Sequence, residues 1–326
     1  MYEFALPQVL DAYNIDYVRI FSPQKGYRNE IWPVLIAKRQ MINVTFYKRE
    51  AGIGSRIKRA DKVSEYLGLK GLPTRRRLNP KILSLSGGGM VVKICVYNYL
   101  PGETIPWESY TMERIKALGR TMSIMHTYLS QMPDISLPSV YDEYLLIINR
   151  MKEYFARSGV KKALSRKLDL QIDSSRLSEY EKLLKAKKNR PGQQALHMDF
   201  VRGNILFKGD DISGVLDFEK TAKGHVEMDI ARTLAFLLVD CKYKTNEKVR
   251  KYFLYSGYRK RGLNKTIDFD NEFENIVEIF LFYDFYKFLL HNPYESLQLN
   301  EHFMRTKDIL VRYGVILLNQ QKGVEV

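Results

Sequence analysis

The chain of 326 residues has few cysteines and no long apolar run. Its two cysteines, Cys95 and Cys241, lie in separate apolar segments, which excludes a disulfide scaffold and the ligand spacing of a zinc site. No apolar stretch approaches the ~20 residues of a membrane span, and the first residues lack the basic-then-apolar layout of a signal peptide. We therefore expect a cytoplasmic protein that has no membrane segment.

Acidic residues are scarce relative to basic ones, since 37 Asp and Glu stand against 52 Lys and Arg. The excess is uneven: residues 157–190 and 55–81 each carry a local balance of +7, whereas residues 268–301 carry −7. Such a field could steer an anionic nucleotide to one face and a cationic substrate to another, but the solvated faces of basic helices would explain it as well. Because no basic stripe is interleaved with aromatic residues, a nucleic-acid partner ranks last.

Internal repeats are also missing, so the organisation follows from the order of the predicted elements. Periodicity over the first hundred residues predicts strands at 17–21, 30–37 and 41–48, a helix at 55–67, and strands at 81–85 and 90–97. After a punctuated connector at 99–103, the rest of the chain is mostly helical. We expect an α+β protein with a small mixed β-sheet lobe at 1–98 and a larger, mainly helical lobe at 99–326.

The segment from His197 to Asp217 contains the residues with the clearest chemistry. Asp199 follows His197 by two positions, Asn204 comes five residues later, and an apolar strand then ends at Asp217. Phosphoryl transfer needs one carboxylate that orients and deprotonates an attacking hydroxyl, and an amide oxygen and a second carboxylate that hold Mg²⁺. The order is typical of kinase catalytic and metal loops. The alternative is that these residues cap backbone groups in turns.

Five motifs in order resemble those of the aminoglycoside phosphotransferase and choline kinase superfamily, which has a bilobal protein-kinase-like fold. They are Tyr99-Leu-Pro-Gly102-Glu103, Leu118-Gly119 with Met125-His126, His197-Met-Asp199 with Asn204, Asp217-Phe-Glu219, and Asp229-Ile-Ala231. The resemblance covers about residues 90–235, and a weaker match extends it over nearly the whole chain. One such motif is a weak signal, but an ordered series is a strong one.

The resemblance implies a role for each matching residue. Asp199 would be the base that faces the acceptor hydroxyl, and Asn204 and Asp217 would bind Mg²⁺. His197 and Asp229 would support the catalytic loop, although a packed core histidine is the simpler interpretation of His197. Small-molecule kinases of this superfamily use ATP, and the implied ATP site includes Gly26, Asn29, Lys48 and Tyr99.

The small lobe departs from the family at the lysine that binds the α- and β-phosphates. By register, Thr45 stands where that lysine is expected, and Lys48 points the other way unless the strand bulges. Lys48 remains the candidate, with an ordinary surface lysine as the alternative. Its acidic partner on the following helix would be Asp61 or Glu65, and the sequence does not separate them.

The acceptor site is predicted in the helical lobe, where residues 269–288 hold eight aromatic residues with Glu274, Glu278 and Asp284 interleaved among them. Aromatic rings and carboxylates together suit a cationic acceptor. From helical spacing we expect Asp284 to be the acid that is partly buried, with Tyr283 lining the same pocket. The alternative is an amphipathic core helix whose acids face water.

These features favour an ATP-dependent kinase that phosphorylates a hydroxyl of a small molecule, such as an aminoglycoside-, choline- or homoserine-like acceptor that could be cationic. Val201 in place of the lysine of protein kinases, and the lack of an alanine-proline-glutamate segment, argue against a protein substrate. A non-catalytic, spore-coat-like structural role is the second hypothesis, which the missing lysine supports. A kinase directed at nucleic acid is the third.

Overall fold

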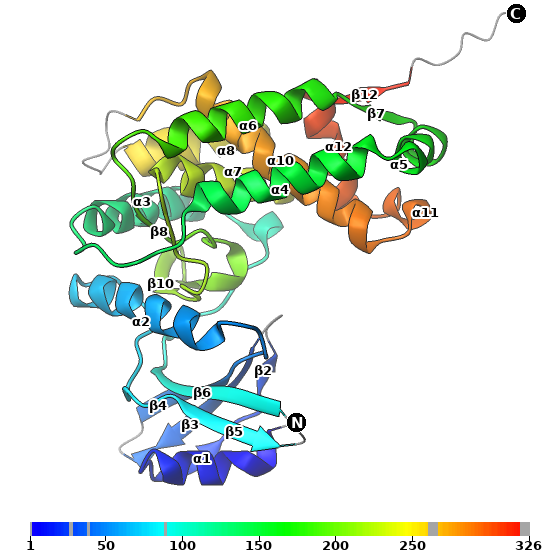
Figure 1. Ribbon diagram of the computed structural model, residues 1–326. Coiled ribbons are helices and arrows are strands. Elements are labelled where there is room, and N and C mark those ends of the chain that lie inside the picture. Colours follow the sequence, from blue (N-terminus) through cyan, green and yellow to red (C-terminus); the bar gives the residue numbers. More distant parts are fainter. Residues whose placement is uncertain (1, 26–28, 38–39, 88–89, 260–266, 320–326) are drawn as a thin grey trace, which may run out of the picture. The chain divides into compact units, whose positions relative to one another are not determined.

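The computed structural model describes residues 2–25, 29–37, 40–87, 90–259 and 267–319. The chain folds into two compact units: Met1–Thr104 with Arg202–Thr221, and Ile105–Val201 with Ala222–Val326. The first contains the sheet and the second is mostly helical, so the predicted α+β class is confirmed (Figure 1). The functional division into a nucleotide lobe and an acceptor lobe stays a prediction.

The first unit is built on a six-stranded sheet in the order β1-β3-β4-β6-β5, with β2 paired to β3. Its strands are β1 (Tyr17–Ile20), β2 (Gln24–Lys25), β3 (Glu30–Ile36), β4 (Gln40–Phe46), β5 (Leu83–Gly87) and β6 (Met90–Asn98). All its strand pairs are antiparallel. The unit is therefore mixed in its helices and strands, not in its strand directions.

A helix packs on each face of this sheet, as the alternation along its strands requires. On one face, Val44 and Phe46 of β4 join the apolar residues of α1 (Leu6–Ala12), which follows the short η1 (Glu3–Ala5). On the other face, Tyr47, which follows β4, joins Tyr97 of β6 and Ile57 of α2 (Ile53–Leu69). Helix α2 and all five predicted strands are confirmed; α1 was not predicted.

A hairpin from later in the chain completes the first unit. It comprises η5 (Arg202–Asn204), β9 (Ile205–Lys208) and β10 (Asp211–Val215). Bridges from Val215 to Thr74 and from Phe207 to Glu103 fix it to the segment Met1–Thr104. This pairing places the predicted metal loop beside the segment that follows α2.

The second unit is a set of packed helices with two small antiparallel strand pairs, β7–β12 and β8–β11. Its elements are η3 (Trp107–Ser109), α3 (Met112–Leu129), α4 (Val140–Ala156), α5 (Ser158–Ala163), η4 (Leu164–Leu168), β7 (Leu170–Ile172), α6 (Ser174–Lys188), β8 (Gln194–Leu196), β11 (Ala222–Gly224), α7 (Val226–Asp240), α8 (Asn246–Arg250), η6 (Lys251–Tyr258), α10 (Asn271–His291), α11 (Tyr294–Leu297), α12 (Glu301–Arg312) and β12 (Ile316–Leu318). No helix in the described ranges has both the length and the apolar character that crossing a membrane would need.

Helix α10 lies at the centre of the second unit and packs against α7, α12, α6 and α4. Buried residues occur on all its sides, from Phe273 to Leu289, as expected for a helix surrounded by others. Its acids do not simply face water, contrary to the amphipathic alternative. Glu278 is buried and accepts hydrogen bonds from Arg176 and from Tyr180 Oη, the latter at 2.7 Å.

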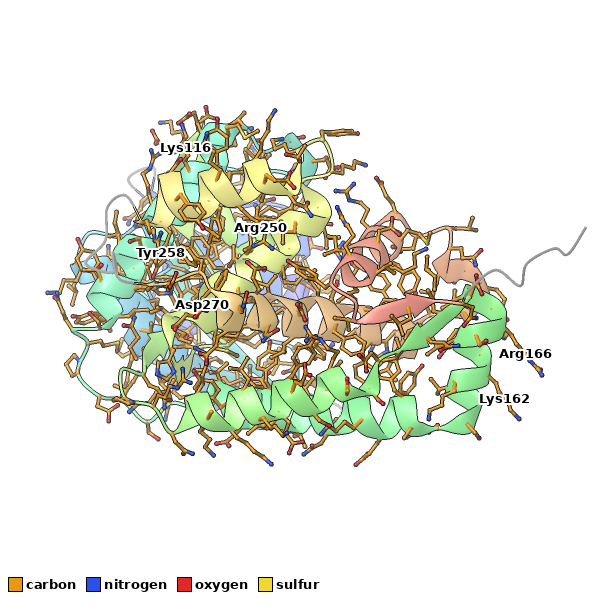
Figure 2. The ribbon with its side chains drawn as sticks, turned by 90° about the horizontal axis from the view of Figure 1, so that it is seen from above. Lys116, Lys162, Arg166, Arg250, Tyr258 and Asp270 are labelled. Atoms are coloured by element: carbon orange, nitrogen blue, oxygen red, sulfur yellow. The ribbon has the colours of Figure 1, made fainter. Side chains whose placement is uncertain are left out.

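The basic stretch 157–190 supplies exposed side chains at one end of the second unit. Lys162 of α5 and Arg166 of η4 point outward there (Figure 2). Their placement agrees with the solvated-face interpretation of the local positive charge.

Candidate active site

The β9–β10 hairpin holds Asn204 and Asp217 at the same end. Val215 pairs with Ile205, and the Leu216 amide donates to the Asn204 carbonyl at 2.8 Å. One residue further on, Asp217 has left-handed backbone (φ 54°), which Asp tolerates better than most residues. Its Oδ1 accepts from the Glu219 amide at 3.3 Å. The two predicted metal ligands are thus brought together by local pairing.

The donors at this hairpin end suit Mg²⁺, which prefers oxygen and is usually held by one or two carboxylates together with substrate phosphates and water. Within the described part of the chain, no three His, Cys, Asp or Glu side chains gather into a metal site. Asn204 and Asp217 would supply two of the oxygen ligands of a bound Mg²⁺.

Glu219 connects the predicted metal loop to the sheet. Asn29 Nδ2 donates to Glu219 Oε1 at 3.0 Å, and Asn29 Oδ1 accepts from the Lys48 amide at 3.2 Å. The structure therefore brings Asn29 to the Asp217-Phe-Glu219 loop. Lys48 lies two residues beyond the end of β4 with an exposed side chain. Tyr99 is exposed just after β6.

Gly26, also predicted at the nucleotide site, lies outside the described residues.

In the second unit, Asp199 lies on the loop that follows β8. It is 9% exposed, and its amide donates to His197 Nδ1 at 3.1 Å. Arg232 Nη2 of α7 donates to Asp199 Oδ1 at 3.1 Å and Nη1 donates to Tyr144 Oη at 2.8 Å. A guanidinium that is fixed by a phenol holds the carboxylate in one orientation.

Asp229, fully buried, supports the same loop from α7. Its Oδ2 accepts from the His197 amide at 2.8 Å and its Oδ1 from the Met198 amide at 2.9 Å, where Met198 has φ 58°. His126 Nε2 lies 3.1 Å from Oδ2, and His126 Nδ1 lies 2.7 Å from Tyr258 Oη. Burial alone would raise the pKa of Asp229, but His126 and the His197 amide bring it below its usual value. Asp229 thus accepts hydrogen bonds from two backbone amides of the loop before Asp199, and its role as a support of that loop stays a prediction.

Tyr283 and Asp284 line a small pocket of the second unit with Arg232, Phe280 and Lys287. Asp284 is partly buried, as predicted, with its side chain 14% exposed, but Glu278 of the same helix is more deeply buried at 5%. The charge of Asp284 is matched by two cations, Lys287 Nζ at 2.8 Å and His302 Nε2 at 2.6 Å. A cationic acceptor would have to compete with both. The pocket therefore offers less uncompensated negative charge than its residue types suggest.

His302 gives this pocket a pH-dependent contact. Burial disfavours its charged form, but Asp240 and Asp284 raise the pKa of His302 to about 9, from 6.5 in the unfolded chain. Because the folded-state pKa is the higher one, the contribution to stability is complete below about pH 6.5 and is lost as the pH rises through about 9.

We expect the stability difference between the wild type and His302→Gln to shrink by up to about 3 kcal/mol between pH 6 and pH 10. Chemical denaturation of both proteins over this range measures it. A difference that does not change with pH would show that the imidazole is not held protonated between the two aspartates.

Two arginines that lie close to predicted site residues in space were not predicted from the sequence. Arg232 comes three positions after Asp229 and one after the recognised Asp229-Ile-Ala231 motif, so its place on α7 was the available signal. Arg75 is buried, and its Nη2 lies 3.9 Å from Glu219 Oε1. In the sequence it belongs to a run of three arginines within a basic segment for which solvated faces are the simpler interpretation.

A family model described as "Phosphotransferase enzyme family" matches residues 55–242, more than half of the chain. The chain therefore belongs to this family, and the predicted family and enzyme class, a phosphotransferase, are confirmed.

Solved structures agree on the fold. Similar ones include an amicoumacin kinase in complex with AMP-PNP, Ca²⁺ and Ami (TM-score 0.69, 14% identity, 95% of this chain and 93% of the other) and a choline kinase from Cryptosporidium parvum (0.59, 13%, 98% and 99%). A third is a microcompartment-associated aminopropanol kinase (0.64, 14%, 95% and 97%). They confirm the kinase-like bilobal fold. A search of curated protein sequences gave no significant match.

Proposed function

We propose that this chain is an ATP-dependent kinase that transfers the γ-phosphate to a hydroxyl of a small molecule. One observation carries the proposal: Asn204 and Asp217 meet at the end of one hairpin, and Asp199 is held on the loop five residues before Asn204. Family membership supports the reaction class. The cytoplasm remains the proposed location.

In the proposed reaction, the acceptor oxygen attacks the γ-phosphorus, the bond from this phosphorus to the oxygen that bridges it to the β-phosphorus breaks, and ADP leaves with that oxygen. The acceptor proton passes to Asp199, whose orientation Arg232 maintains. Asn204 and Asp217 would hold Mg²⁺, which when bound neutralises charge on the phosphates.

For the acceptor, we propose a chemical class and not a particular compound. The similar structures include kinases named for amicoumacin, choline and aminopropanol, which supports a hydroxylated small molecule that carries an amine. The aromatic lining near Tyr283 suits such a compound, although the charge of Asp284 is already matched.

A non-catalytic role is the second candidate, because Thr45 stands where the strand lysine is expected. Thermal denaturation with and without millimolar Mg²⁺-ATP separates the two. Stabilisation by several degrees supports the kinase, whereas an unchanged melting temperature favours the structural role. A screen of hydroxylated amines and amino acids for ATP consumption then identifies the acceptor.

Removing one proposed metal ligand should change the metal requirement. We expect Asn204→Ala to raise the Mg²⁺ concentration for half-maximal activity by ~10-fold or more, because one oxygen ligand is lost. Mg²⁺ titration of the rate at saturating ATP measures it. The exposed Asn189→Ala is the matched control. An identical Mg²⁺ curve for Asn204→Ala and wild type would remove Asn204 from the metal site.

A further inference from the structure

The strand that should carry the phosphate-binding cation does not supply one. Thr45 occupies the expected position on β4, fully buried, and its Oγ1 makes no hydrogen bond to any described residue. It stands opposite Ile31 on one side and Cys95 on the other. Tyr47, two residues on, is also buried, and Lys48 lies past the strand end. A cation for the phosphates has to come from elsewhere in the unit.

Arg75 brings a cation to this place from the segment after α2. Its amide donates to the Val215 carbonyl at 3.2 Å, and the Val215 amide donates to the Pro73 carbonyl at 2.8 Å. This pairing anchors Arg75 to Val215, which lies two residues before Asp217 in the sequence. Its guanidinium nitrogen Nη2 lies 3.9 Å from Glu219 Oε1, so the cation lies next to the Asp217-Phe-Glu219 loop.

Two phenols connect this cation to the acid of α2. Arg75 Nη2 donates to Tyr47 Oη at 3.2 Å, and the guanidinium carbon lies 4.2 Å from the centre of the Tyr97 ring. Tyr47 Oη and Tyr97 Oη are 2.5 Å apart, and Tyr97 Oη donates to Asp61 Oδ1 at 3.2 Å. Of the two acids considered for α2, Asp61 is buried and Glu65 is exposed. Asp61 thus forms its direct ion pair with Arg77, whose Nη1 lies 2.9 Å from Asp61 Oδ2, and is linked to Arg75 only through the two tyrosines.

The guanidinium keeps donors for an anion. Among the described residues, Arg75 makes one side-chain hydrogen bond, from Nη2, and Nε and Nη1 make none. Burial works against its charge, but Tyr47, Tyr97 and Asp217 raise the pKa of Arg75 above its usual value. A charged, buried arginine with open donors matches phosphate oxygens in geometry and charge.

We infer that Arg75 is the phosphate-binding cation of this enzyme and that its guanidinium donates to the α- and β-phosphate oxygens of the nucleotide. The inference rests on the proposed kinase function. It assigns to the segment after α2 the phosphate contact that the sequence pattern predicts for β4. The competing interpretation is an ion pair that only holds Glu219.

Binding of Mg²⁺-ADP and of adenosine, measured by calorimetry, separates these interpretations. We expect Arg75→Met to weaken ADP by ~20-fold or more and adenosine by less than ~2-fold, because only ADP carries the phosphates that Arg75 binds. The neighbouring exposed Arg76→Met should leave both affinities unchanged. Equal affinities of Arg75→Met and wild type for ADP, or equal losses for ADP and adenosine, would overturn the inference.

Arg75→Lys keeps the test decisive if the methionine variant does not fold. Lysine retains the positive charge but not the forked arrangement of N–H donors. We therefore expect its affinity for ADP to lie between that of the wild type and that of a variant without the cation. Its affinity for adenosine should equal that of the wild type. A lysine variant that loses ADP and adenosine to the same degree would contradict the inference. Wild-type protein that turns over ATP while Arg75 variants bind ADP normally would leave the kinase function intact and reject Arg75 alone. Wild-type protein that binds no nucleotide would reject both.

Discussion

Asp199→Asn should lower the rate of phosphoryl transfer by about three orders of magnitude, within the range found for loss of a general base. The amide cannot take the acceptor proton, but its oxygen can still accept from Arg232 Nη2, which bonds Asp199 at 3.1 Å. The loop should therefore keep its shape, and the affinity for Mg²⁺-ATP should stay within about threefold of the wild type. Steady-state kinetics with the identified acceptor, together with nucleotide titration, measure both quantities.

The control for this experiment is Asp211→Asn, which removes an exposed carboxylate from β10. We expect its kcat to equal that of the wild type. If Asp199→Asn retains turnover, Asp199 does not act as the base for the acceptor hydroxyl. A parallel loss of ATP binding would instead indicate that Asp199 contributes to the nucleotide site.

Much of the candidate site could be predicted because its signals are local. Asn204 and Asp217 flank a short hairpin, so sequence spacing alone brings them together. The alternation along β4 likewise predicts that Thr45 and Lys48 point to opposite faces; both faces are covered by helices, and Lys48 is exposed because it lies beyond the end of the strand. Local patterns of this kind are set by pairing between neighbouring segments.

Arg75 and Arg232 could not be predicted because their partners are distant in sequence. Arg75 meets Glu219 from 144 positions away, and only the pairing of Val215 with Pro73 brings them together. In sequence, Arg75 does not differ from the exposed Arg76 beside it. Whether an arginine is buried depends on the phenols and carboxylates that surround it in the fold. The local sequence does not show which of these groups will lie near Arg75.

The charges around α10 illustrate the same difficulty. Residue types along the helix suggested either a cation pocket or acids facing water. In the structure, Glu278 is matched by Arg176 of α6, and Asp284 by Lys287 and by His302 of α12. Two of these three cations come from other helices, so the compensation depends on tertiary packing.

Asp229→Ala should have the largest effect on stability, a loss of about 3–5 kcal/mol in the free energy of unfolding. The change leaves His126 without its carboxylate and the amides of His197 and Met198 without acceptors, all in a fully buried place. Asp229→Asn should lose less, because its amide oxygen still accepts from one backbone amide. Urea denaturation of each variant measures the loss.

Asp134→Ala serves as the control, because this carboxylate is 83% exposed and its ion pair with Lys223 should contribute under about 1 kcal/mol. Asp229 also holds the left-handed backbone of Met198, the residue before Asp199. Folded Asp229→Asn should therefore show a lower kcat with little change in nucleotide affinity, because it misplaces the base and not the phosphates. A variant that is destabilised but fully active would mean that Asp229 supports the core without positioning Asp199.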